Sequence, residues 1–281
     1  MPTLIPIADP ADPRVEAYRD VRERDLRGRE DRFIAEGEVV LRILLSQSRF
    51  GVESVFLSQR RVAPLGPVLD LLPANVPVYF TASSVMDGVA GFPVHRGILA
   101  IGARRIQPQA SELLRCLGPE ALVLGLIGIA NHDNMGGLFR NAAAFGADAI
   151  LLDDTSCDPL YRKAIRVSVG ASLTVPFMRA GRAGDLLGTL LDAAFEVLAL
   201  TPGGAEPVEL IRRPPRCALL LGAEGPGLPP ELLARTRTVR IGMAANFSIP
   251  STSRPPAALR CTDWPMSPTA PIDTPERAEI M

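Results

Sequence analysis

Residues 121–154 read ALVLGLIGIANHDNMGGLFRNAAAFGADAILLDD. The opening run, 121–128, is apolar without strict alternation, which is typical of a strand buried on both faces of a parallel sheet. Residues 136–147 are predicted to form a helix that is closed by Gly146, because glycine readily adopts the left-handed conformation found after helices. Residues 149–154 are predicted to form a second strand, so the whole stretch predicts a β-loop-α-β unit.

The same alternation continues along the chain and predicts an α/β fold with a parallel sheet. Its later members are a helix at 158–171, a strand at 173–178, a helix and strand in 185–200, a strand, loop and helix in 217–233, and a strand at 239–243. Ligands of open parallel sheets bind at the carboxyl ends of the strands, and most of the glycines here follow strands.

The preceding segment, 1–105, is predicted to be a small α/β domain. The second half of the stretch 18–47 is predicted to be helical, and strands are expected at 52–58, 76–81 and 96–103. Residues 106–120 are interpreted as a linker and 121–247 as the second domain. Residues 248–281 are rich in Pro, Ser and Thr without an apolar period, which predicts an aberrant tail that lacks packed structure.

The composition narrows the class of protein. Hydrophobic residues make up 47%, and 30 Lys and Arg balance 31 Asp and Glu, so the overall charge does not indicate nucleic-acid binding, although a local basic patch remains compatible with it. Four scattered cysteines and two histidines argue against a metal site and against a disulfide framework. With no expected signal sequence or membrane-spanning run, we expect a cytoplasmic protein.

Two constellations are candidates for chemistry. Asn134 lies at the start of the expected 136–147 helix, and Arg140 lies about one turn into it. The glycines at 136 and 137 would let a ligand approach the backbone closely. The plain alternative is that Asn134 caps the helix and that Arg140 is a surface residue.

The second constellation is the sequence LLLGAEGPGL at 219–228, in which three glycines surround Glu224. A glycine-rich loop between a strand and a helix is weak evidence for a nucleotide-like ligand, and an ordinary turn is its alternative.

In this order, Asn134 with RNAAAFGA, KAIRVSVGAS (163–172), LLLGAEGPGL and VRIGM (239–243) together resemble the SpoU-type (TrmH-like) RNA ribose 2′-O-methyltransferases of the SPOUT superfamily. The resemblance implies a trefoil-knotted α/β domain, a homodimer and S-adenosylmethionine (SAM) as the cofactor, with no metal. FIAEGEVVLRILL (33–45) and HRGILAIGA (95–103) resemble the small, ribosomal-protein-like RNA-binding domain that often precedes the knotted domain.

The resemblance also implies roles for individual residues. Arg140 would activate the ribose hydroxyl together with a substrate phosphate that accepts the proton, because arginine itself stays protonated. Asn134 would orient that arginine or the hydroxyl, and Glu224 would shape the cofactor loop. The backbones of Gly222 and Ile241 would lie on either side of the SAM adenine. The full set of residues that would bind the cofactor is Thr201, Leu221, Gly222, Gly227, Ile241 and Met243.

RNA, either rRNA or tRNA, is expected to contact the N-terminal domain through Arg96 and the arginine run Arg22, Arg24 and Arg27. Acidic residues are interleaved with that run, so a solvated helix face is an equally simple interpretation of it.

The chain departs from the family after VRIGM, where a segment similar to SLNV and a small-residue helix should follow. The sequence continues instead as ANFSIPSTSRPPAALRCTDWP. When residues 248–265 are translated back into GC-rich codons and read one base earlier, the result is FDSLNVAAAGGAALHRLA. We therefore hypothesise a frameshift near Phe247.

Two alternatives to an active methyltransferase follow. The chain could be a non-catalytic RNA-binding protein that has lost cofactor binding through the frameshift. An unrelated nucleotide-binding enzyme would rest on GAEGPG alone, because the chain lacks the Lys-Ser/Thr of a phosphate loop and the GxGxxG fingerprint.

Overall fold

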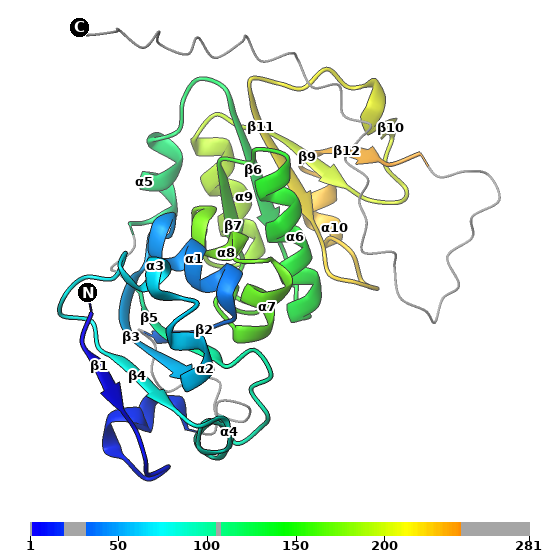
Figure 1. Cartoon of the computed structure of the whole chain (residues 1–281). Helices are drawn as coiled ribbons and strands as arrows, with labels where there is room; N and C mark the ends of the chain where they lie inside the picture. The colour runs from blue at the N-terminus through cyan, green and yellow to red at the C-terminus, as the bar shows by residue number, and fades with distance from the viewer. Residues whose placement is uncertain (1, 20–31, 105–107, 243–281) are drawn as a thin grey trace, which may run out of the picture.

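The computed structural model describes residues 2–19, 32–104 and 108–242, which form two lobes, each built on one β-sheet (Figure 1). The alternation of strands and helices confirms the α/β class that the sequence predicts. No helix in these ranges is long and apolar enough to cross a membrane.

The N-terminal lobe contains a mixed five-stranded sheet with the order β1-β4-β3-β5-β2. Strands β1, β4 and β3 are parallel, whereas β5 runs antiparallel to both β3 and β2. The elements of this lobe are β1 (Leu4–Pro6), the 3₁₀ helix η1 (Pro13–Tyr18), β2 (Arg32–Glu36), α1 (Glu38–Ser46), β3 (Gly51–Ser58), α2 (Gln59–Val62), α3 (Gly66–Leu69), β4 (Val78–Thr81), α4 (Ser83–Ala90) and β5 (Ile98–Ala103).

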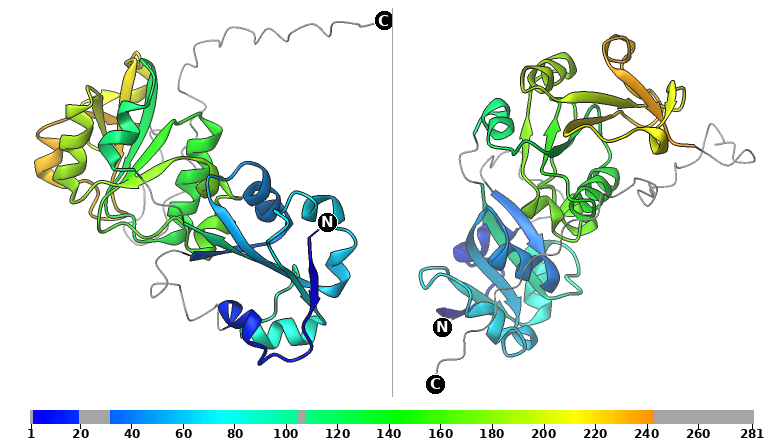
Figure 2. Two further views of the ribbon diagram at one scale, coloured as in Figure 1. Left: turned by 90° about the vertical axis from the view of Figure 1, so that its left-hand side faces the viewer. Right: turned by 90° about the horizontal axis from the view of Figure 1, so that it is seen from above.

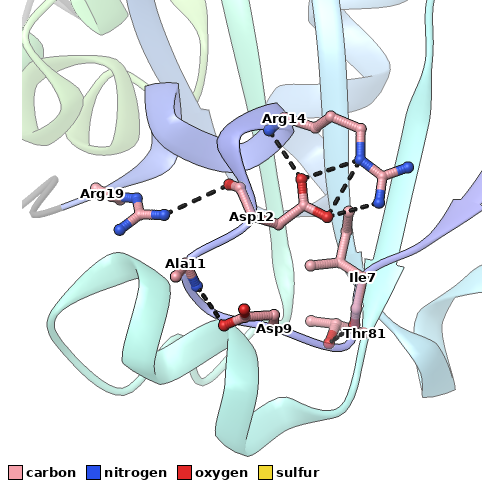
Figure 3. A network of polar contacts seen from close by, with 7 residues as sticks. All are labelled: Ile7, Asp9, Ala11, Asp12, Arg14, Arg19 and Thr81. Carbon is pink, nitrogen blue, oxygen red and sulfur yellow. Dashed lines mark hydrogen bonds and ion pairs between the residues drawn. The ribbon is translucent and has the colours of Figure 1, made fainter.

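A short polar network fixes the turn between β1 and η1 (Figure 3). The Asp12 carboxylate accepts a hydrogen bond from the backbone N–H of Arg14 at 2.9 Å and forms an ion pair with its guanidinium at 2.5 Å. These contacts with Arg14 lower the pKa of Asp12 to about 2. The Thr81 hydroxyl donates to the carbonyl of Ile7 at 2.6 Å, which ties the turn to the end of β4.

The C-terminal lobe contains a seven-stranded sheet with the order β10-β12-β9-β11-β6-β7-β8, and every neighbouring pair is parallel. Its elements are α5 (Ala110–Arg115), β6 (Ala121–Leu126), α6 (His132–Ala144), β7 (Ala149–Leu152), α7 (Arg162–Val167), α8 (Ala171–Thr174), β8 (Phe177–Arg179), α9 (Ala183–Asp192), β9 (Glu196–Leu200), β10 (Glu206–Pro207), η2 (Val208–Leu210), β11 (Arg216–Leu221), α10 (Pro230–Leu233) and β12 (Arg237–Arg240).

Helices cover both faces of this sheet, which explains why its strands are apolar without alternation. Along β6, Val123 packs into the core cluster shared with α5, α9 and α10, whereas Leu124 and Leu126 pack into the cluster shared with α6, α7 and α8. Strand β7 divides in the same way, with Leu151 on the first face and Ile150 on the second.

The second of these clusters continues into the N-terminal lobe, so the two lobes share one apolar core. Figure 2 shows the two lobes meeting, with the N-terminal lobe in blue to cyan and the C-terminal lobe in green to orange. At their junction the rings of Phe50 and Phe177 are 6.4 Å apart, and the guanidinium of Arg49 lies 4.4 Å from the centre of the Phe177 ring. A Cβ atom at Gly170 would lie only 2.9 Å from Cδ1 of Ile43, so α1 and α8 approach closely here.

Several local features differ from the sequence-based expectations. Helix α6 begins at His132, four residues before the expected start at 136, and β12 ends at Arg240, whereas the strand was expected at 239–243. The helix expected at 158–171 is divided into α7 and α8, because Val169 and Gly170 have positive φ angles of 55° and 86°. The strand expected at 173–178 begins only at Phe177, since Leu173 belongs to α8. Residues 32–36, expected to be helical, form β2.

The expected linker, 106–120, contains α5, which packs through Ala110 and Leu114 into the same cluster as α9. The domain limits themselves stay a prediction. The knot implied by the family resemblance, like the aberrant tail, depends on residues after Gly242, which lie outside the described residues.

Candidate active site at the carboxyl ends of the parallel strands

The order of strands brings several predicted site residues to one edge of the sheet. Strands β12, β9, β11 and β6 are neighbours, so their carboxyl ends lie side by side. Thr201 follows β9, Leu221 ends β11 and Ile241 follows β12. The N–H of Thr201 donates to the carbonyl of Val239 at 2.9 Å, which joins the ends of β9 and β12. This edge therefore brings together predicted cofactor-binding residues that are separated by up to forty positions in the sequence.

The glycine loop after β11 folds back on itself. Ala223 and Gly227 form an isolated antiparallel bridge, in which the N–H of Gly227 donates to the carbonyl of Ala223 at 3.0 Å. Gly225 and Gly227 have φ angles of 91° and 72°, which favour glycine. A Cβ atom at Gly222 would lie 2.3 Å from the carbonyl carbon of Gly227, so this position has no room for a side chain. The loop is thus a compact hairpin that projects Glu224.

A hydrogen bond connects the two predicted constellations. The side-chain amide of Asn134, on α6, donates through Nδ2 to Oε2 of Glu224 at 3.0 Å. The two residues are 90 positions apart in the sequence, and Glu224 is exposed. Asn134 is not the helix cap, because that role belongs to Asn131, whose side chain accepts from the N–H of Asp133 at 2.8 Å. The capping alternative for Asn134 is therefore removed.

Arg140 lies on α6 and is exposed to solvent. Six residues of α-helix separate two positions by about 9 Å along the axis and by about 240° around it, so Arg140 and Asn134 project in different directions. Within the described residues Arg140 forms no hydrogen bond or ion pair with Asn134 or Glu224. Its contribution to this site stays a prediction that involves a bound substrate.

Glycine at 136 serves packing between helices. A Cβ atom there would lie 2.8 Å from the carbonyl oxygen of Ala164 and 2.7 Å from Cβ of Val167, both on α7. The close approach expected at this glycine is therefore to a helix rather than to a ligand, whereas Gly137 has open space around its Cβ position. The ion pair of Lys163 with Asp133, at 2.6 Å, adds a second link between the two helices.

A buried carboxylate, which the sequence analysis did not single out, orders the loop that leads into α6. Asp153 is only 3% exposed and accepts hydrogen bonds from the backbone N–H groups of Gly128 and Ser156 and from the hydroxyls of Thr155 and Ser156. Burial opposes its ionisation, but the hydrogen bonds from Ser156, Thr155 and Gly128 outweigh burial, so the pKa of Asp153 is lowered.

The Ser156 hydroxyl extends this network by accepting from the N–H of Ile129 at 3.1 Å. Arg179 closes it from the other side by donating to the carbonyls of Asp153 and Ser156 at 2.7 and 2.9 Å. A polar residue directly after an apolar strand was the only sequence signal available for Asp153. The partners that define its role come from three different segments.

The remaining predicted residues are outside this edge or outside the described ranges. Arg96 is exposed on the turn before β5 in the N-terminal lobe, away from the glycine loop. Arg22, Arg24, Arg27 and Met243 lie outside the described residues. In the described part of the chain, no group of three or more His, Cys, Asp or Glu residues is arranged to hold a metal ion.

Comparison with known proteins identifies the class to which this fold belongs. The sequence profile of the SpoU rRNA methylase family matches residues 121–249. An uncharacterized tRNA/rRNA methyltransferase of Mycobacterium tuberculosis is 38% identical over 244 residues, which cover 84% of this chain and 82% of the relative. The chain therefore belongs to the SpoU family of RNA methyltransferases.

More distant relatives agree with this assignment. The 23S rRNA (guanosine-2′-O-)-methyltransferase RlmB of Vibrio cholerae is 25% identical over 180 residues, which cover 63% of this chain and 73% of that protein. Among solved structures, the AdoMet-bound rRNA methyltransferase from Sinorhizobium meliloti has a TM-score of 0.70 at 21% identity, covering 88% of this chain and 92% of that one. AviRb from Streptomyces viridochromogenes, in complex with AdoMet, has a TM-score of 0.69 at 18% identity, covering 85% and 92%. At these identities the structural likeness establishes the fold.

Proposed function

We propose that this chain is built to transfer a methyl group from SAM to a ribose 2′-OH of rRNA or tRNA. The observation that carries the proposal is the hydrogen bond between Asn134 and Glu224, because it joins the two family constellations at the carboxyl edge of the parallel sheet. The AdoMet-bound structures with the same fold and the relative named as a guanosine-2′-O-methyltransferase support the cofactor and the ribose hydroxyl as acceptor.

The residues present fit SAM in part. The compact hairpin 222–227 and the ends of β9 and β12 lie next to one another, and Ile241 presents an apolar side chain, 39% exposed, at this edge. Thr201, Leu221, Gly222, Gly227 and Ile241 would hold the cofactor, which supplies an electrophilic methyl group. The wall that Met243 and the following segment would add lies outside the described residues.

In this proposal the chain's own residues prepare the acceptor. Asn134, held by Glu224, orients the ribose hydroxyl, because its position on α6 does not bring it to the Arg140 guanidinium. Arg140 stays charged and binds the substrate phosphate, which accepts the proton that leaves the hydroxyl. The loop before α6 is held in place by the Asp153 network, so that Asn134 is fixed before the substrate binds.

Methyl transfer from labelled SAM to rRNA and tRNA, with 2′-O-methylation detected by resistance to alkaline hydrolysis, tests the activity. Arg140→Ala is expected to lower kcat/KM by about a hundredfold or more, because it removes the positive charge that binds the phosphate beside the reacting hydroxyl. Arg115→Ala is the matched control, because Arg115 is also exposed but lies on α5, which packs on the opposite face of the sheet. Equal rates for both variants would remove Arg140 from the mechanism.

A non-catalytic, RNA-binding chain is the second candidate, favoured by the departure from the family at residues 248–281. The family profile ends at residue 249, close to the frameshift that we propose near Phe247. Calorimetric titration of SAM separates the two candidates when this chain is compared with a version that continues FDSLNVAAAGGAALHRLA from position 248. If only the restored chain binds SAM, the frameshift has destroyed the cofactor site. If both bind, the tail is tolerated, and if neither binds, the cofactor assignment is wrong.

We also propose that the restored chain forms a homodimer, as the resemblance implies. Sedimentation equilibrium of the two versions checks this point, and we expect a monomer for this chain and a dimer for the restored one. Dimers of both versions would show that residues before 248 are sufficient for association.

A further inference from the structure

The junction of the two lobes carries a group of five arginines, of which only Arg96 was expected from the sequence to contact RNA. Arg162, on α7, forms an ion pair with Glu36, at the end of β2, at 2.8 Å. Arg166, one turn later, reaches the same carboxylate oxygen at 3.9 Å. Glu36 is only 8% exposed, so one buried carboxylate of the N-terminal lobe faces two guanidinium groups of the C-terminal lobe. The junction therefore has an excess of positive charge.

Three further arginines of the N-terminal lobe adjoin this pair. The Arg96 side chain lies across Gly37, where a Cβ atom would be 2.9 Å from its Cδ and Nη1 atoms. Arg61 donates to the backbone carbonyl of Arg96 at 3.0 Å, and Arg60 donates to that of His95 at 3.3 Å. Gly37 directly follows Glu36, so this group begins where the Glu36 ion pair ends.

An aromatic side chain connects the two sets of arginines. The Arg162 guanidinium lies 4.5 Å from the centre of the Phe92 ring, and Phe92 belongs to the turn that leads to His95 and Arg96. The arginines at this junction thus come from α2, from the turn before β5 and from α7, which are linked by the contacts of Arg60 and Arg61 with that turn and of Arg162 with Phe92.

The charge of this group is not neutralised inside the protein. Backbone carbonyls accept hydrogen bonds from Arg60 and Arg61 but carry no negative charge. Within the described residues, the ion pairs of these five arginines involve Glu36 alone. Arg60 and Arg96 are exposed, and the Arg166 side chain is 44% exposed. A concentration of positive charge on a protein of net charge −1 is a local feature that attracts polyanions.

The position of α7 relates this surface to the candidate site. The carbonyl of Ala164 and the side chain of Val167 contact α6 at Gly136, two residues after Asn134. Lys163 is paired with Asp133, the residue before Asn134. A strand of RNA held by the junction arginines would therefore be held beside the helix that carries Asn134.

We propose that Arg60, Arg61, Arg96 and Arg166 form a phosphate-binding surface for the sugar–phosphate backbone of RNA, which crosses from the N-terminal lobe to α7. This inference rests on the proposal that the chain acts on RNA, and it assigns the backbone contact to the lobe junction. Arg162 is the structural member of the group, because its guanidinium is engaged by Glu36 and Phe92.

The test is direct binding of a labelled 30-nucleotide RNA hairpin to the full 281-residue chain between 50 and 200 mM NaCl, without SAM. Three variants are tested separately: the double variant Arg60→Gln/Arg61→Gln and the single variants Arg96→Gln and Arg166→Gln. A combined variant carries all four substitutions. Each arginine that contacts a phosphate contributes about one unit to the slope of log affinity against log salt, so the combined variant is expected to lose about four units. Arg166→Lys should keep most of the slope, because a point charge still binds phosphate.

Arg42→Gln is the matched control, since Arg42 is exposed in the same lobe but paired with Glu38. Thermal unfolding of every variant shows whether the fold is retained. An unchanged slope in the combined variant, an equal loss in Arg42→Gln, or no binding of the hairpin to the parent chain overturns the inference. Failure of methyl transfer with the salt slope intact counts against the proposed activity and leaves this surface in place.

Discussion

The two sides of the candidate site are constructed in different ways. On the side of β6 and β7, the loop that leads into α6 is held by Asp153, which is 3% exposed and accepts four hydrogen bonds. On the side of β12, the last described strand ends at Arg240, and the next residue, Ile241, is 39% exposed. One side is closed by its own polar contacts, whereas on the other the apolar side chain of Ile241 is partly exposed.

This difference separates two parts of the proposed reaction. Asn134 and Glu224, which would orient the acceptor, are linked to each other within the described residues. Ile241 stands at the edge that the family continues with the SLNV-like segment, which this sequence lacks. We therefore expect changes on the β6–β7 side to affect the stability of the chain, and changes on the β12 side to affect cofactor binding.

The largest effect is expected for Asp153→Ala. Removing this carboxylate takes away the acceptor of the Gly128 N–H and of the Thr155 hydroxyl, and leaves the Ser156 N–H with only the longer bond to the backbone carbonyl of residue 153, so the free energy of unfolding should fall by about 3 kcal/mol. Urea unfolding measures the change. Asp154→Ala is the control, because Asp154 is the exposed next residue, and a change below about 0.5 kcal/mol is expected there. Similar losses in both variants would contradict the special role of Asp153.

Gly222→Val should have the next largest effect. Its Cβ atom would overlap the backbone of Gly227, so the hairpin must open, and we expect a loss of about 2 kcal/mol in the free energy of unfolding. Gly188→Ala, in α9, provides the comparison, because nothing lies within 4 Å of its Cβ position. Helix propensity predicts a gain of about 0.5–1 kcal/mol for that control. A stable Gly222→Val variant that still binds SAM would show that the hairpin adapts.

Acid should weaken the β6–β7 side more than the β12 side. The pKa of Asp153 is lowered in the folded chain, so its contribution to stability is present above the unfolded carboxyl pKa and is lost as the pH falls through the folded value. We expect the parent chain to lose more unfolding free energy than Asp153→Asn between pH 6 and pH 3. Equal losses would assign the acid sensitivity to other carboxylates.

The smallest effect concerns the bond between Asn134 and Glu224. Both side chains contact solvent, so a double-mutant cycle of Asn134→Ala and Glu224→Ala should give a coupling of about 0.5–1 kcal/mol in unfolding free energy. Glu224→Gln should retain much of it, because the amide oxygen still accepts the hydrogen bond. A coupling of zero would show that this hydrogen bond contributes nothing to the stability of the folded chain.

The sequence was sufficient for the elements with strong periodic signals. The apolar runs that became β6, β7 and β11 and the helix closed by Gly146 are confirmed, because burial on both faces and a left-handed glycine leave clear patterns. The break between α7 and α8 was missed, since it depends on Val169, a β-branched residue that rarely adopts a positive φ.

Contacts between distant segments were less accessible. The family resemblance placed Asn134 and Glu224 in one site, but no spacing in the sequence predicted their hydrogen bond. The ion pair of Glu36 with Arg162 joins residues from different lobes, and neither residue belongs to a local pattern that predicts the other. Of the four hydrogen bonds to the Asp153 carboxylate, only that from Gly128 joins distant segments, because the other three come from Thr155 and Ser156, two and three positions later in the sequence.

The strand order also has a consequence for how the chain folds during synthesis. Strands β6, β7 and β8 pair with their neighbours in sequence and have their covering helices between them, so they can associate soon after leaving the ribosome. The other edge of β6 pairs with β11, in which Arg216 lies opposite Ala121, so this edge stays unpaired until the chain has been synthesised through β11. Closing such a long loop is slow, and the open edge of β6 can meanwhile pair with another nascent chain. Additional chaperone should therefore raise the yield of folded protein during expression, although it leaves the equilibrium stability of the folded chain unchanged.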